Sequence, residues 1–290
     1  MSSLTVRKLD VDLSRGFGRR WLGGDAYRTQ FFNALSMTFP IGEQMFIDSL
    51  RAIPEDALRP PALRAEVKDF IGQEATHRHM HVQYNAELER QGLAFVTGPR
   101  LERRIARVNG FGVRSRVAIT CALEHYTAML ADGVLRHPEW IEDAEPQLRR
   151  LWEWHAVEEL EHKAVAFDAY RAIGGGYWRR VLWFTHVSVV FWFDNFCQTA
   201  HNLHRDGALW RPGTWLSAAR VWFGRRGLAW HMVKPVLEYY SPRFHPWQHD
   251  NRALLTMWLD SNSDAYRAVR STAARSAACP ARGRGGHAVS

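Results

Sequence analysis

Residues 152–170, with the sequence WEWHAVEELEHKAVAFDAY, decide the fold because they combine a helical pattern with a spaced carboxylate and imidazole. Side chains at positions i and i+3 of a helix project from one face. Glu159 and His162 therefore present a carboxylate and an imidazole to the same point. Glu158 points about 100° away from Glu159 around the helix and is predicted to face solvent. This stretch predicts half of a dinuclear metal site.

The other half of such a site is predicted earlier in the chain. Glu74 and His77 have the same spacing, and Glu43 and Glu124 are single glutamates within apolar segments of helical periodicity. A Glu from each of two helices and a Glu-x-x-His from each of two others form the ligand set of the di-iron and di-manganese carboxylate bundles. The sequence therefore predicts six metal ligands, namely Glu43, Glu74, His77, Glu124, Glu159 and His162.

The order and spacing of these residues carry more weight than either motif, because a single Glu-x-x-His arises easily by chance. Glu43 and Glu74 are 31 residues apart, Glu74 and Glu124 are 50 apart, and Glu124 and Glu159 are 35 apart. The first and third gaps suit adjacent antiparallel helices joined by short turns. The middle gap leaves room for a crossover through residues 92–113. We therefore predict an all-α fold with a ferritin-like four-helix bundle.

The charge of the predicted site favours bound metal. An ionised carboxylate on an apolar face costs several kcal/mol unless it is paired or bound to a cation. Four converging carboxylates would also repel one another. Two divalent cations cancel four negative charges, and the two imidazoles add nitrogen ligands. Mixed carboxylate and imidazole ligation suits iron or manganese and tolerates zinc, so we predict two divalent ions, with iron first.

Four further residues are candidates for supporting roles. His81 lies one turn beyond His77, and His155 one turn before Glu159, so either could hydrogen-bond to a ligand and orient it, or be an extra ligand. Tyr84 and Tyr126 could be redox-active neighbours of the metals. For each of the four, ordinary packing in the core is the more frequent role.

The remaining pattern predicts the organisation of the chain. Pro40 and Gly42 predict a kink one turn before Glu43. A fourth long helix is expected over residues 143–173, ended by three consecutive glycines. We expect four regions: an N-terminal arm at 1–24, a di-metal four-helix bundle at 25–176, an aromatic-rich helical extension packing on the bundle at 177–260, and a disordered basic tail at 261–290.

Composition narrows the partners and the compartment. The net charge is +8, but no nucleic-acid-binding module is recognisable, so we expect no nucleic-acid partner. The three cysteines are far apart and the N-terminus lacks an apolar signal, which predicts a cytoplasmic protein. Residues 177–258 mix tryptophan with arginine. These helices either cover the open side of the bundle, make peripheral contact with the inner membrane, or form an apolar substrate channel.

Five segments together resemble a known family. They are FPIGEQMF (39–46), GQEATHRHMH (72–81), CALEHYTA (121–128), HAVEELEHKAVAFD (155–168) and EYYSPRFHPW (238–247). Over residues 31–250 the chain resembles the bacterial family catalogued as predicted metal-dependent hydrolases. The wider ferritin-like di-iron superfamily, which includes the ribonucleotide reductase small subunit, shows the same order of ligands. The resemblance implies the same six ligands, with none missing.

Three functions are compatible with this sequence. The first expectation is a di-iron oxidase or oxygenase that activates dioxygen, takes a small hydrophobic substrate and receives electrons from a donor protein. The alternative is a hydrolase in which paired metals activate water against an ester or phosphoester. Hydrolysis would benefit from cationic side chains near the metals, which would stabilise the developing anion. Arg78 and Lys163 adjoin ligands, but both lie off the inner stripe of their helices. The third is a non-catalytic, membrane-associated metal-binding protein.

Overall fold

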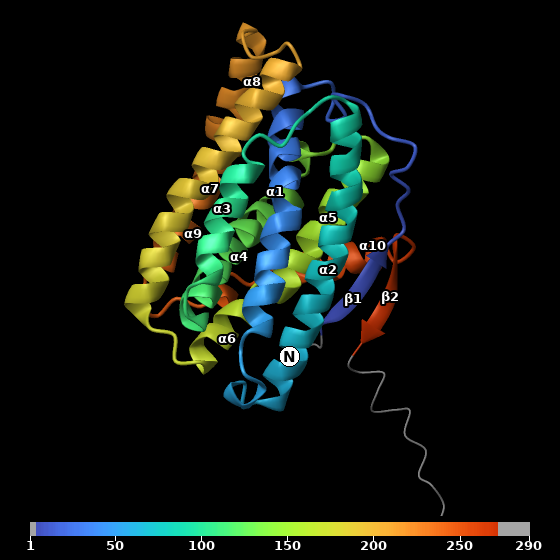
Figure 1. The fold of residues 1–290 in the computed structure, drawn as a ribbon. Coiled ribbons are helices and arrows are strands. Elements are labelled where there is room, and N and C mark those ends of the chain that lie inside the picture. The colour runs from blue at the N-terminus through green and yellow to red at the C-terminus, as the bar shows by residue number, and fades with distance from the viewer. Residues whose placement is uncertain (1–3, 272–290) are drawn as a thin grey trace, which may run out of the picture.

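The computed structural model describes residues 4–271, and within them the protein is all-α apart from one two-stranded sheet (Figure 1). The ten α-helices of this described part differ widely in length. Their bounds are α1 Ala26–Arg51, α2 Pro61–Arg90, α3 Gly98–Asn109, α4 Val113–Arg136, α5 Pro146–His162, α6 Val165–Ala172, α7 Tyr177–Arg205, α8 Pro212–Phe223, α9 Leu228–Tyr239 and α10 Arg252–Ser261. Short 3₁₀ turns occupy Glu55–Ala57, Pro138–Trp140 and Pro246–Gln248.

Four of these helices surround the predicted ligands. Helix α1 packs against α2 and α4, and α5 packs against the same two helices, so the contacts form a closed ring. The crossover segment between α2 and α4 carries helix α3 (Figure 1). This arrangement is compatible with the expected four-helix bundle, whose ferritin-like character stays a prediction.

Helix α1 continues through Pro40, and the kink predicted there stays a prediction. Asp25 caps its first turn, because the Asp25 side chain accepts a hydrogen bond of 3.0 Å from the backbone N–H of Arg28. Pro40 has no N–H, so the carbonyl of Ser36 loses its partner within the helix. The side-chain amide of Asn85 on α2 donates to that carbonyl at 2.9 Å. A polar residue on the neighbouring helix thus replaces the missing helical bond.

The long fourth helix predicted over residues 143–173 is two helices, so this prediction was wrong in detail. Helix α5 ends at His162 and α6 begins at Val165. The buried side chain of Lys163 turns toward the C-terminal region at the break. Its Nζ donates to the carbonyl of His249 at 2.6 Å and to Oδ1 of Asn251 at 2.8 Å. Helix α6 continues alongside α4 and α2.

The aromatic-rich residues after Gly176 form helices α7 to α10. Helix α7 packs along α4 and α1, α8 packs on α1, and α9 packs on α4 (Figure 1). No helix within residues 4–271 combines the length and apolar character needed to cross a membrane.

The two ends of the described chain pair with each other. Strand β1 (Thr5–Leu9) forms an antiparallel pair with β2 (Tyr266–Ser271), and β1 lies against α2 (Figure 1). A Cβ at Gly72 of α2 would lie 2.7 Å from Cγ2 of Val6, so only glycine permits this close approach. A disordered tail was predicted over 261–290, which was wrong for Tyr266–Ser271 because a long-range pairing orders this strand. The rest of the predicted tail, 272–290, lies outside the described residues.

Candidate metal centre

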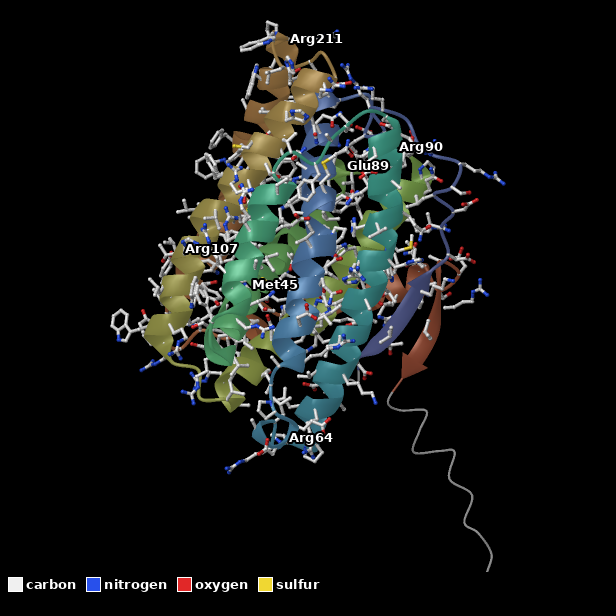
Figure 2. The ribbon with its side chains drawn as sticks, in the orientation of Figure 1. Met45, Arg64, Glu89, Arg90, Arg107 and Arg211 are labelled. Atoms are coloured by element: carbon white, nitrogen blue, oxygen red, sulfur yellow. The ribbon has the colours of Figure 1, made fainter. Side chains whose placement is uncertain are left out.

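The six predicted ligands come together in the interior, each with at most 3% of its surface exposed. Nε2 of His162 lies 3.1 Å from Oε1 of Glu74, 3.4 Å from Oε2 of Glu124 and 3.6 Å from Oε2 of Glu159. On the other side, Nδ1 of His77 lies 3.4 Å from Oε1 of Glu159. Figure 2 shows the side chains between these helices, with Met45 labelled two residues beyond the ligand on α1.

The ligand atoms form two overlapping groups. Glu43, Glu74 and His77 form one, and Glu74, Glu159 and His162 form the other, with the atoms of each group within 4.8 Å of one another. Glu74 belongs to both groups, so it would contribute to holding an ion at either position. Glu124 joins the second group through its contact with His162. The grouping gives two neighbouring positions, each with carboxylate and imidazole donors.

The hydrogen-bonding state of these residues tests whether they fit metal ions. Buried polar atoms in folded proteins almost always have a hydrogen-bond partner. Here nine buried ligand atoms have none: both carboxylate oxygens of Glu43, Glu74 and Glu124, Oε2 of Glu159, Nδ1 of His77 and Nε2 of His162. Each belongs to one of the six predicted ligands. The donor set therefore fits divalent cations, which would satisfy all of these atoms at once.

Glu158 orients His77, and the prediction that Glu158 faces solvent was wrong. Its side chain is fully buried, and Oε2 lies 3.0 Å from Nε2 of His77. The carboxylate accepts the Nε2 proton, which leaves Nδ1 free to face Glu159. Arg7 of β1 covers Glu158 at 3.4 Å and also pairs with Glu161. Glu158 is buried because β1, whose pairing the sequence pattern did not reveal, covers that face of α5.

Gln73 orients His162 in the same way. Nε2 of Gln73 donates to the carbonyl of Thr5 at 3.1 Å and to Glu161 at 2.9 Å. Its Oε1 must then accept from Nδ1 of His162, at 3.1 Å, which leaves Nε2 of His162 directed at the carboxylates. Sequence reasoning missed Gln73, Glu158 and Arg7. Gln73 directly precedes Glu74 and Glu158 directly precedes Glu159, and this adjacency to a predicted ligand could have identified them. The sequence offered no such signal for Arg7.

Of the two candidate histidines, His155 contacts the ligand set directly and His81 contacts His155. Nε2 of His155 lies 2.9 Å from Oε1 of Glu159, and Nδ1 of His155 lies 2.7 Å from Nε2 of His81. The tyrosine hydroxyls are directed elsewhere. Tyr84 donates to Asn33 at 2.6 Å, and Tyr126 donates to Ser188 at 2.7 Å.

Burial and mutual charge shift the ionisation of the six residues. Burial raises the pKa of Glu43 and of Glu124 well above the ordinary range, and neighbouring carboxylates raise both further. Burial alone would also raise the pKa of Glu159, but the charge of His162 and the proximity of His155 and His77 hold it well below its usual value. Burial would lower the pKa of His77, yet the adjacent carboxylates of Glu158 and Glu159 raise it to about 10. Without metal, protons on these buried groups supply the neutralising charge, and bound cations would replace those protons.

Two cavities reach the same face of this centre, and Phe39, Thr127, His155 and Glu159 line both. The first has a volume of about 740 Å³. It runs between apolar side chains of α1, α4 and α5 to a mouth lined by Arg28, Arg220, Arg225 and Arg226. The second, about 470 Å³, lies between α1, α3, α4 and α7 and presents mostly apolar surface, although Arg104, His186 and Asp194 also line it.

The fold and the centre together define an all-α protein with a buried carboxylate and histidine cluster suited to metal ions. The chain belongs to the family described as predicted metal-dependent hydrolase, whose sequence model matches residues 5–250. The resemblance noted from the sequence is thereby confirmed. Neither curated proteins nor solved structures gave a match.

Proposed function

We propose that this protein is a dinuclear metal-dependent hydrolase acting on an apolar molecule that carries an anionic group. The observation that carries the proposal is the set of nine buried ligand atoms without hydrogen-bond partners, beside two cavities. Two bound divalent cations would lower the pKa of water and polarise a substrate carbonyl or phosphoryl oxygen. The six ligands would hold them, while Glu158 and Gln73 fix two imidazoles in the required tautomer.

The larger cavity supports the substrate class. Its inner walls include Phe31, Leu35 and Leu130, which would receive an apolar chain and exclude water. Its mouth carries four arginines. Within the described part of the chain, Arg220 and Arg225 form no salt bridge, so both are available to bind a carboxylate or phosphate. A substrate would therefore place its anionic group at the mouth and its reacting group near Glu159 and His155.

We favour hydrolysis over oxidation because hydrolysis is the activity in the family description, although the sequence alone favoured oxidation. Oxidation with dioxygen is the second candidate. Its specific support is the second cavity, whose apolar walls would admit dioxygen or the far end of an apolar chain to the same centre. The iron ions and the electron-donor protein predicted from the sequence belong to this second candidate.

One experiment separates the two reactions. Protein loaded with Zn²⁺ or Mn²⁺ would be assayed without dioxygen on long-chain acyl esters and phosphoesters that carry an anionic group. Turnover that disappears in Glu124→Ala but persists in the exposed control Glu89→Ala supports hydrolysis (Figure 2). If these substrates stay intact, and Fe²⁺-loaded protein instead develops a charge-transfer absorption in air that bleaches on reduction, oxidation replaces hydrolysis.

We also propose that helices α8 and α9 rest on an anionic membrane surface. Trp215, Leu216 and Phe223 of α8 and Trp230, Val233 and Leu237 of α9 are each at least half exposed and recur at helical spacing. Residues 207–240 contain four arginines and one lysine against one glutamate. Exposed aromatic stripes mixed with cations are typical of interfacial helices. Because α8 and the turn after it also line the larger cavity, an apolar substrate could enter directly from lipid.

A further inference from the structure

A chain of hydrogen bonds runs from helices α1 and α2 to His155 on α5, beside the candidate metal centre. The chain begins at Pro40, whose missing N–H exposes the carbonyl of Ser36 to Asn85. Because that carbonyl can only accept, the Asn85 NH₂ group faces it, and Oδ1 of Asn85 faces the hydroxyl of Ser36 at 2.8 Å. The orientation of the Asn85 amide is therefore settled by the backbone.

The hydroxyl of Ser36 transmits this orientation to His81. An amide oxygen only accepts, so the single proton of the Ser36 hydroxyl is donated to Asn85. Nδ1 of His81 lies 2.9 Å from the same hydroxyl oxygen. With its proton already used, that oxygen must accept, so Nδ1 of His81 carries the proton. A neutral imidazole carries a single proton, so Nε2 of this buried ring is left as a lone pair.

The lone pair of His81 in turn sets the tautomer of His155. Nδ1 of His155 lies 2.7 Å from Nε2 of His81 and must donate to it. A neutral imidazole carries a single proton, and His155 uses that proton toward His81. Its Nε2 therefore carries a lone pair. That lone pair faces Oε1 of Glu159 at 2.9 Å, an arrangement of two acceptors that a cation between or beside them would satisfy.

The opposite tautomer fails at the far end of the chain. If Nε2 of His155 donated to Glu159, Nδ1 of His155 would have to accept from Nε2 of His81. The Nδ1 atom of His81 would then require the proton of Ser36. Two acceptors, the Ser36 oxygen and Oδ1 of Asn85, would face each other at 2.8 Å without a proton. Each arrangement therefore leaves one pair of facing acceptors, and burying such a pair is unfavourable. The pair at Ser36 and Asn85 has no cation site beside it, whereas the pair at His155 and Glu159 lies where the proposed cations would bind, so bound metal favours the first arrangement.

We infer that His155 is a seventh metal ligand, and that Ser36, His81 and Asn85 are positioning residues that fix its Nε2 toward the ion. This inference rests on the proposed metal centre. The ligand atoms of His77, His155 and Glu159 lie within 4.8 Å of one another. The metal position beside Glu43 and His77 would thus have two imidazole ligands, His77 and His155. The metal position beside Glu124 and His162 would have one. His155 also lines both cavities, so the two positions present different ligands to a substrate.

Proton NMR of the Co²⁺-loaded protein tests this inference. The ring N–H of each histidine bound to Co²⁺ gives a strongly shifted, exchangeable signal, so the signals count the imidazole ligands. We expect three signals in the wild-type protein, two in His155→Gln and three in the control His231→Gln, a histidine on α9 that contacts Met129 instead. Three signals that persist in folded His155→Gln, or two in the wild-type protein, would overturn the assignment. The wild-type count decides even if a variant fails to fold.

A second measurement tests the positioning residues. Ser36→Ala removes the hydroxyl that holds His81, and we expect Co²⁺ affinity to fall about 10-fold, the lower end of the range for groups that orient ligands. Unchanged affinity and an unchanged count of shifted signals would show that Ser36 has no positioning role. Wild-type protein that binds no Co²⁺ would refute the proposed metal centre itself, whereas two bound ions with two shifted signals would refute the seventh ligand alone.

Discussion

The carboxylate of Glu158 lies 3.0 Å from Nε2 of His77, and both side chains are fully buried. This contact fixes the ring so that Nδ1 faces the other ligands. A buried carboxylate beside a ligand histidine raises its basicity and determines which nitrogen is free. Glu158 therefore belongs to the candidate centre even though it is not one of the six ligands.

Removing the Glu158 carboxylate should weaken metal binding. We expect Glu158→Ala to reduce Co²⁺ affinity about 10- to 100-fold, because His77 loses the group that fixes its tautomer. Calorimetric titration measures this change. Glu153→Ala is the matched control on α5, since Glu153 pairs with Arg149 instead. Equal affinities for the two variants would contradict the role of Glu158.

Arg7 should stabilise the folded protein through the same carboxylate. It is almost fully buried against Glu158 and Glu161. Replacing one partner of a buried ion pair typically costs about 3 kcal/mol, because the other charge is left uncompensated. We expect Arg7→Met to lower the free energy of unfolding in urea by about this amount. The double variant Arg7→Met with Glu158→Gln should recover part of the loss, and a purely additive result would exclude the coupling.

Metal removal should destabilise the protein. Ions that bind only the folded state stabilise it by about 2.7 kcal/mol per site at a free concentration of 100 times Kd. The chelated protein should therefore unfold at a lower temperature in calorimetry, and added Mn²⁺ or Co²⁺ should restore the original midpoint. Glu124→Ala should retain one of two bound ions and show a smaller shift. A midpoint indifferent to chelation would argue against the centre.

The arginines at the cavity mouth should bind an anionic group. Dodecanoate combines a carboxylate with an apolar chain and is a suitable probe. We expect Arg225→Ala to weaken dodecanoate binding about 10-fold, equivalent to about 1.4 kcal/mol. Arg211→Ala is the control, because Arg211 is exposed but does not line the cavity (Figure 2). Similar losses in both variants would indicate a nonspecific charge effect.

The exposed face of α8 and α9 should bind vesicles. We expect the protein to float with vesicles of anionic lipid, and part of this binding to survive high salt because apolar side chains contribute to it. Trp215→Ser combined with Phe223→Ser should abolish flotation. Val82→Ser, at an exposed valine on α2, should not. A protein that stays at the bottom of the gradient, or binding that vanishes completely in salt, would exclude an apolar contact.

The sequence by itself predicted the all-α class, the family and the six side chains that meet in the interior. These features depend on local periodicity, because residues three or four apart share a helix face and charged residues on apolar faces signal an internal partner. The order of Glu43, Glu74, Glu124 and Glu159 along the chain was enough to place each on its own helix. Whether they hold two ions stays a prediction.

Only the tertiary structure decided what surrounds those side chains. The pairing of β1 with β2 buries Glu158 beneath Arg7, the break after His162 turns Lys163 away, and Asn85 on α2 serves a carbonyl on α1. Each contact joins segments far apart in sequence or depends on the direction of a hydrogen bond, neither of which periodicity encodes. The same holds for the two cavities, because their shape follows from how whole helices pack.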